Sequence, residues 1–147
     1  MPCNLNKPQA IALIKGGDFT PTIIGKVKFY QKRNCVLVVA DIKNLPNTNT
    51  GFFGFHIHEG SDCDGIDFLN SKSHYNPVDV SHPKHAGDLP PLMLCGNNAH
   101  FSVLTDRFSV AEIIGRTVII HDMTDDFTTQ PSGNSGQKIA CGVIKWK

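Results

Sequence analysis

Residues 50–58 read Thr-Gly-Phe-Phe-Gly-Phe-His-Ile-His, and their alternation decides the class of fold. Successive side chains of an extended strand point to opposite faces, so residues two apart share a face. One face of this segment carries large apolar side chains: Phe53, Phe55 and Ile57. The other face carries His56 and His58. The segment therefore predicts a β-strand that packs on a core and holds two imidazoles close enough to bind one metal ion.

The rest of the chain contains more segments of this kind. Further stretches of β-branched or aromatic residues are bounded by turn residues, a pattern typical of strands: residues 9–15, 22–32, 34–42, 98–104, 116–121 and 137–146. Residues 109–115 predict a short helical turn that ends at Gly115. Many short strands without an internal repeat predict an all-β fold, a sandwich or barrel with Greek-key connections.

Composition excludes several classes of protein. The 147 residues include 14 lysines and arginines against 13 acids, and no basic run points to nucleic acid as a partner. No apolar stretch is long enough to cross a membrane as a helix. The N-terminus lacks the apolar core of a signal peptide, which predicts a cytoplasmic protein. The alternative is an exported protein whose signal peptide is absent from this sequence.

Two long polar segments interrupt the strands of what we expect to be one domain, residues 1–147. Residues 59–90 are rich in Gly, Ser, Asp, His and Pro, and residues 122–136 are polar with several turn residues. Loops of this length in a small domain are usually functional or disordered. Four candidate metal ligands lie in the first loop, which favours a loop held in place by metal.

Six of the seven histidines and one aspartate form a spaced set of candidate metal ligands: His56, His58, His74, His82, His85, His121 and Asp88. Imidazole is the commonest metal-binding side chain in proteins. His82, His85 and Asp88 lie three residues apart, so they can converge on one ion. With His74 they offer three nitrogens and one carboxylate oxygen, a set that suits tetrahedral zinc.

The second set, His56, His58 and His121 with His74 again, offers four nitrogens and suits Cu(II). One imidazole has two nitrogens, so His74 can bind one ion at each end once both protons are lost. Two cations stabilise the resulting anion. A bridging histidine therefore couples a redox change at copper to the transfer of a proton. His100 lies outside both sets and reads as an ordinary strand or surface residue.

The motifs around these residues resemble those of the Cu/Zn superoxide dismutase family. They occur in the family's order and cover nearly all of the chain: Gly54-Phe-His-Ile-His-Glu59, Ser73-His-Tyr-Asn-Pro77, His85-Ala-Gly-Asp-Leu89, Gly115-Arg-Thr-Val-Ile-Ile-His121 and Gly133-Asn-Ser-Gly…Ala140-Cys-Gly-Val-Ile144. The resemblance implies an eight-stranded antiparallel Greek-key fold. The short loops, with Cys63 five residues after His58, look like those of bacterial members.

The resemblance also implies the reaction, the dismutation of superoxide with one copper and one zinc ion per chain. The implied ligands are His56, His58, His74 and His121 for copper, and His74, His82, His85 and Asp88 for zinc. One superoxide would reduce Cu(II) and leave as oxygen. A second would reoxidise Cu(I) and leave as hydrogen peroxide, taking one proton from His74 and one from solvent.

Three further positions take roles from the resemblance. Asp125 stands where the family has a carboxylate that bridges the free nitrogens of His56 and His82; the alternative is a solvated loop acid. Lys138 stands where the family has an active-site arginine, and a lysine lacks the planar fork of a guanidinium. Its alternative is a surface lysine unconnected to the site. Ser132 would line the substrate channel.

Five cysteines cannot all pair within one chain, so at least one thiol is free or pairs between chains. The resemblance implies a disulfide between Cys63 and Cys141 that anchors the first long loop to the last strand. The alternative is two reduced thiols, as expected in a cytoplasm. Cys3 and Cys35 then remain unpaired or pair otherwise. Cys95 follows Leu-Met-Leu, which predicts a buried thiol.

Other functions remain open from the sequence. A dismutase-like domain that stores or delivers metal is one, although this chain keeps all four copper ligands. A zinc hydrolase needs an open position on zinc, and four residues fill that shell here. A purely structural protein would require a sealed copper site. Superoxide is the expected partner, without nucleic acid or membrane. A homodimer fits the resemblance, but no apolar stripe identifies its surface.

Overall fold

Short strands make up most of the regular structure in residues 7–147, the part of the chain that the computed structural model describes. Along the chain they are β1 (Ala10–Gly16), β2 (Ile24–Gln31), β3 (Val36–Lys43), β4 (Phe52–Phe53), β5 (Phe55–His58), β6 (Leu92–Met93), β7 (Ala99–Thr105), β8 (Thr117–His121) and β9 (Lys138–Trp146). Two helical elements lie between them, the 3-10 helix η1 (Ile66–Ser71) and the α-helix α1 (Val110–Ile113). The expected helical turn is α1.

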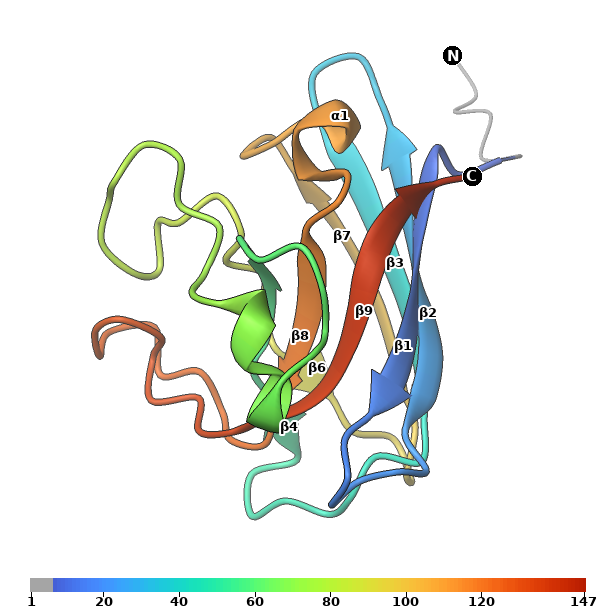
Figure 1. Ribbon diagram of the computed structural model, residues 1–147, viewed down its shortest axis with the longest axis vertical. Helices are drawn as coiled ribbons and strands as arrows, with labels where there is room; N and C mark the ends of the chain where they lie inside the picture. The colour runs from blue at the N-terminus through green and yellow to red at the C-terminus, as the bar shows by residue number, and fades with distance from the viewer. Residues whose placement is uncertain (1–6) are drawn as a thin grey trace.

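The strands form a curled antiparallel sheet whose two edges meet. The large sheet has the order β5-β8-β9-β1-β2-β3-β7, and β4 pairs with β6 in a small ladder. Because β4 leads directly into β5 and β6 precedes β7, this ladder joins the two edges of the large sheet at one end (Figure 1). Only Gly54 separates β4 from β5, so the two make one interrupted strand. The all-β fold with eight strands is therefore confirmed.

The core lies inside the curled sheet because apolar side chains alternate along the strands. Val27 and Phe29 of β2 are fully buried and pair with Ala40 and Val38 of β3, which are also fully buried. Lys26, on the opposite face of β2, is exposed. Burial of each large apolar side chain contributes about 1.5–3 kcal/mol, so this alternation sets the register of the sheet.

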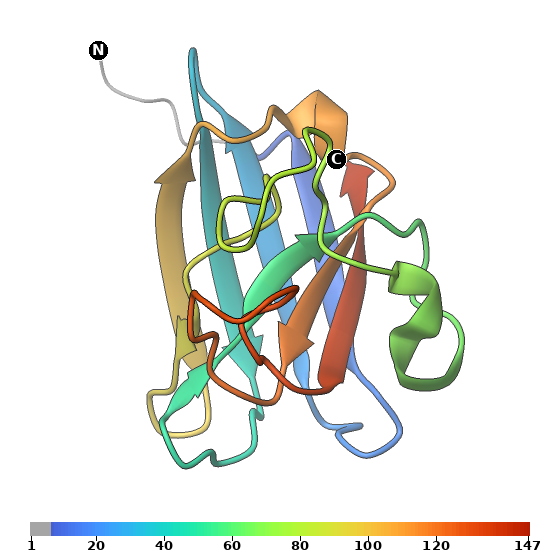
Figure 2. The ribbon, with the colours of Figure 1, turned by 90° about the vertical axis from the view of Figure 1, so that its left-hand side faces the viewer.

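Both long loops lie on the same side of the barrel, over β5 and β8 (Figures 1 and 2). The first loop contains η1, which no periodicity revealed, because Asp67 and Phe68 have positive φ angles and break the helical repeat. The strand β6 was also missed, since two residues carry no period. His100 of β7 is exposed, and its Nδ1 lies 2.6 Å from Asp41 Oδ1 on the neighbouring strand β3, as expected of a surface strand residue.

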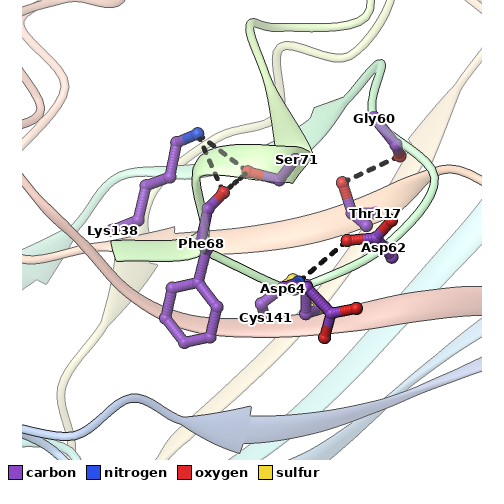
Figure 3. Close-up of a disulfide and its surroundings, with 9 residues drawn as sticks. Gly60, Asp62, Asp64, Phe68, Ser71, Thr117, Lys138 and Cys141 are labelled. Carbon is purple, nitrogen blue, oxygen red and sulfur yellow. Dashed lines mark hydrogen bonds between the residues drawn. A yellow bond between two sulfur atoms is a disulfide. The ribbon is translucent and has the colours of Figure 1, made fainter. Parts of the chain in front are cut away.

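A disulfide joins Cys63 of the first loop to Cys141 of β9, 78 residues further along the chain (Figure 3). The implied pairing is therefore present. Cys35 and Cys95 carry free thiols, and Cys95 is exposed in a tight turn with Asn98, so the expectation of a buried thiol was wrong. The position of Cys3 lies outside the described residues.

Removal of this disulfide should lower the free energy of unfolding. A crosslink over this separation contributes about 4 kcal/mol by restricting the unfolded chain. We expect the double variant Cys63→Ser with Cys141→Ser to lose about that much in denaturant titrations. Cys95→Ser is the matched control, because it removes an exposed free thiol, and its midpoint should stay that of the parent. Equal midpoints for all three proteins would contradict the prediction.

Candidate metal centre

The outer edge of β5 positions the candidate ligands of the first loop. Ile57 donates its N–H to Gly87 O and accepts the N–H of Tyr75, each at 2.8 Å. Two stretches of the loop therefore run beside β5 as further strands would. Because Tyr75 and Gly87 are the chain neighbours of His74 and Asp88, these bonds bring both candidate ligands to the histidine face of β5.

The first group of potential ligand atoms comes from His56, His58, His74 and His121, and all four residues are buried. One atom from each lies within 4.8 Å of the others. His58 Nε2 lies 3.2 Å from His121 Nε2. His121 ends β8 at a bulge in its pairing with β9, which places its ring beside the rings of β5.

The second group comes from His74, His82, His85 and Asp88, and its four ligand atoms also lie within 4.8 Å of one another. Asp88 is at its centre, with Oδ1 2.8 Å from His74 Nδ1 and Oδ2 3.0 Å from His82 Nδ1. The backbone N–H of His85 donates to Asp88 Oδ2 at 2.9 Å, which holds the carboxylate in this orientation.

A single ring belongs to both groups. Nδ1 of His74 lies among the atoms of the second group, 3.2 Å from His85 Nδ1. Its Nε2 is buried without a hydrogen-bond partner. The ring centroid of His74 is 4.0 Å from that of His56 and 4.9 Å from that of His58. The ring of His74 therefore lies between the other members of the two groups and offers one nitrogen to each.

The donor atoms fit metal ions. Among residues 7–147, three buried side-chain nitrogens have no hydrogen-bond partner: His56 Nδ1, His74 Nε2 and His82 Nδ1. The last lies 3.0 Å from Asp88 Oδ2 but without the geometry of a hydrogen bond. Each buried polar atom without a partner lowers the free energy of unfolding by about 1–3 kcal/mol. A bound cation that accepts the lone pairs of these nitrogens would remove that cost. In His58, Nδ1 donates to Lys72 O at 2.8 Å. A carbonyl only accepts, so His58 carries its proton there and turns a lone pair toward the first group.

One carboxylate orients a ring in each group. Asp125 Oδ2 accepts from His56 Nε2 and Oδ1 accepts from His82 Nε2, each at 2.8 Å, and Asp125 is buried. Because a carboxylate fixes the proton on these nitrogens, the Nδ1 atoms of both rings are left as lone pairs. Gly133 lies directly against this bridge: a Cβ there would fall 1.9 Å from Asp125 Oδ1.

Burial lowers the pKa values of His56, His58 and His121 and so keeps these three rings neutral. Desolvation, followed by the nearby imidazole of His74, lowers the pKa of His121 to about 3. Desolvation and neighbouring imidazoles also hold the pKa values of His56 and His58 well below the ordinary value. Burial alone would raise the pKa of Asp88, but the hydrogen bond from His74 and the surrounding imidazoles outweigh it and lower the pKa. Neutral imidazoles and an ionised carboxylate are the forms that bind metal cations.

Two residues that sequence reasoning missed hold the backbone of the second group. Gln130 Nε2 donates to His82 O at 2.7 Å and its Oε1 accepts the His82 N–H at 2.9 Å. Arg107 donates to the carbonyls of Pro83 at 2.7 Å and His85 at 3.2 Å. Their partners are backbone atoms far away in sequence, so no residue spacing could have indicated either contact.

The remaining predicted positions lie nearby. Lys138, the first residue of β9, is half-buried, and its Nζ donates to Ser71 Oγ and Lys72 O, each at 2.8 Å. Lys72 O is also the acceptor of the His58 ring, so Lys138 is linked to the first group through one carbonyl. Ser132 is half-buried in the second loop, where its carbonyl accepts from Ser135 Oγ at 2.7 Å.

The fold and the two ligand groups define a β-barrel protein with a paired metal site. A family model described as copper/zinc superoxide dismutase (SODC) matches residues 23–144. A Cu-Zn superoxide dismutase of Legionella pneumophila is 36% identical over 133 residues, covering 85% of this chain and 80% of that protein. Superoxide dismutase [Cu-Zn] 1 of Aquifex aeolicus is 35% identical, with 83% and 80% covered. The chain belongs to the copper/zinc superoxide dismutase family.

Gly133→Ala should disturb both groups through Asp125. The added Cβ would collide with the carboxylate that orients His56 and His82, and loss of such support typically costs roughly 10-fold to 100-fold in metal affinity. Zinc affinity, measured by competition with a chelator, should fall by that order. Gly96→Ala is the control, because Gly96 has a similar positive φ of 64° but nothing within 4 Å of the added atom. Equal affinities for both variants would refute the role of the contact.

Proposed function

We propose that this chain catalyses the dismutation of superoxide to oxygen and hydrogen peroxide, with one copper and one zinc ion as cofactors. The observation that carries the proposal is the ring of His74, which contributes to both ligand groups. Membership of the family supports the same activity. In this proposal residues 1–147 are one domain, with metal-binding residues in the loop 59–90 and a substrate channel beside the loop 122–136.

The two ions are assigned by the chemistry of the donors. Four nitrogens suit copper, whereas three nitrogens and a carboxylate oxygen suit zinc. The proposed copper ligands are His56, His58, His74 and His121, and the proposed zinc ligands are His74, His82, His85 and Asp88. Bound copper supplies the one-electron redox chemistry. The second set uses four residues and leaves no position for a reactive water, which argues against a zinc hydrolase.

The protein's own residues handle the protons and the substrate charge. His74 Nε2 is the atom at which one proton is held and released, because it is buried and has no other partner. The second proton of hydrogen peroxide comes from solvent. Asp125 keeps the rings of His56 and His82 in orientation. Lys138 attracts the superoxide anion by its charge, and Ser132 lines the approach.

Superoxide is the substrate, and a homodimer is the assembly to be tested by sedimentation. Within the described range, no helix is long and apolar enough to span a bilayer. A cytoplasmic location was expected, but the disulfide between Cys63 and Cys141 supports the alternative of export, because such bonds persist in oxidising compartments.

Metal analysis combined with superoxide turnover tests the proposed function. Protein loaded with copper and zinc should bind one of each per chain and remove superoxide, whereas protein loaded with zinc alone should be inactive. Full occupancy by both ions without turnover would refute the enzyme and favour a family member that stores or delivers metal.

Lys138→Arg should raise the rate. A guanidinium keeps the charge and adds donors in a planar fork, so it guides an anion better than an ammonium does. We expect the rate at low salt to rise a few-fold and the gain to shrink as salt screens the attraction. Lys145→Arg, an exposed substitution on the same strand, is the control and should leave the rate unchanged. An unchanged or lower rate for Lys138→Arg would contradict the prediction that a guanidinium guides superoxide better at this position.

A further inference from the structure

The ammonium group of Lys138 is surrounded by acceptors from one short segment, the end of η1. Nζ lies 2.8 Å from Ser71 Oγ, 2.8 Å from Lys72 O and 3.5 Å from Phe68 O. Figure 3 shows the side chain reaching from β9 toward Ser71 and the Phe68 carbonyl. An ammonium has three N–H donors, and three acceptors account for all of them. The charge is therefore held at one point and is not free to move over the surface.

The local backbone explains why these acceptors converge. Asp67 and Phe68 have positive φ angles inside η1, and Lys72 has a φ of 60° directly after it. These residues interrupt the regular helix, in which each carbonyl would point along the axis. The interruption turns the carbonyls of Phe68 and Lys72 toward the first residue of β9.

Ser71 has the one hydroxyl among these acceptors, and the hydroxyl is oriented. The residue is fully buried, and its Oγ donates to Phe68 O at 2.7 Å. A hydroxyl has a single proton, so donation to Phe68 leaves only lone pairs for Lys138. The serine therefore accepts from the ammonium and cannot turn away from it without losing its own bond.

We propose that Ser71 is a positioning residue for Lys138: its buried hydroxyl keeps the lysine charge at a fixed place beside the first ligand group. The inference rests on the proposed function, in which Lys138 attracts superoxide. A lysine has a flexible stem and no planar fork, so it needs acceptors around its ammonium to stay in one orientation. Lys72 O ties this orientation to the site, because the same carbonyl accepts from the ring of His58.

The competing explanation is that Ser71 only closes the turn of η1. The chain contains a matched control for it. Ser135 is also fully buried, and its hydroxyl donates to the carbonyl three residues earlier, Ser132 O, at 2.7 Å. Ser71→Ala and Ser135→Ala each remove one buried turn-closing hydroxyl. Only Ser71→Ala removes an acceptor from Lys138.

The first measurement uses protein loaded with both metals and does not depend on its activity. Lys138 is acylated with a small amine-reactive reagent, and its rate of labelling is followed by peptide mapping. A hydrogen bond to a charged group contributes enough for a change on the order of tenfold, so Ser71→Ala should raise the labelling rate by about that factor. Ser135→Ala should label at the parent rate. Equal labelling of Lys138 in both variants would overturn the proposal.

The second measurement uses protein loaded with both metals. Ser71→Ala should lower the rate at low salt a few-fold and flatten its salt dependence, while the copper content stays constant. In a Lys138→Arg background the same serine substitution should have a smaller effect, because the guanidinium carries more donors. Faster labelling without any change in the salt dependence would overturn the role of this lysine in attraction. An inactive parent would instead refute the proposed function and leave the labelling result standing.

Discussion

The structure of the site depends on one shared imidazole. The ring of His74 contributes to two groups of ligand atoms, so both groups must be built within the reach of a single side chain. That requirement explains why two stretches of the first long loop, at Tyr75 and at Gly87, hydrogen-bond to Ile57 of β5. The two backbone bonds place His74 and Asp88 beside the histidines of the strand. A loop attached less firmly would not keep His74 and Asp88 beside the histidines of β5.

Around this centre, polar contacts replace the packing that a loop cannot supply. Asp125 orients one ring of each group, Gln130 clamps the backbone of His82, and Arg107 binds two carbonyls of the same loop. The disulfide between Cys63 and Cys141 and the ammonium of Lys138 attach η1 to β9. Each of these contacts joins segments that are remote in the chain, so the site is rigid only in the folded barrel.

Much of the fold follows from local patterns. The period of two in β2 and β5 predicted strands, and the structure has both. In β2 only one face is buried, whereas in β5 the histidine face is buried as well. The candidate ligands were recognised because imidazole and carboxylate are the right donors at close spacing. Short elements were missed, since β6 has two residues and η1 contains positive φ angles that no propensity indicates. Burial of Cys95 was wrongly predicted from its apolar neighbours, whereas a tight turn exposes it.

By itself, the sequence determined the β-rich class of the chain, the types of donor atom and the motifs of the dismutase family. These properties depend on residue identity and on spacing over a few positions. Only the tertiary structure decided that Gln130 and Arg107 hold the backbone of the first long loop. It also decided that Ser71 and Lys72 accept hydrogen bonds from the ammonium of Lys138. The contacts of Gln130, Arg107 and Lys72 each involve a backbone group, which every residue possesses. Such groups become specific only when the fold turns them toward one point.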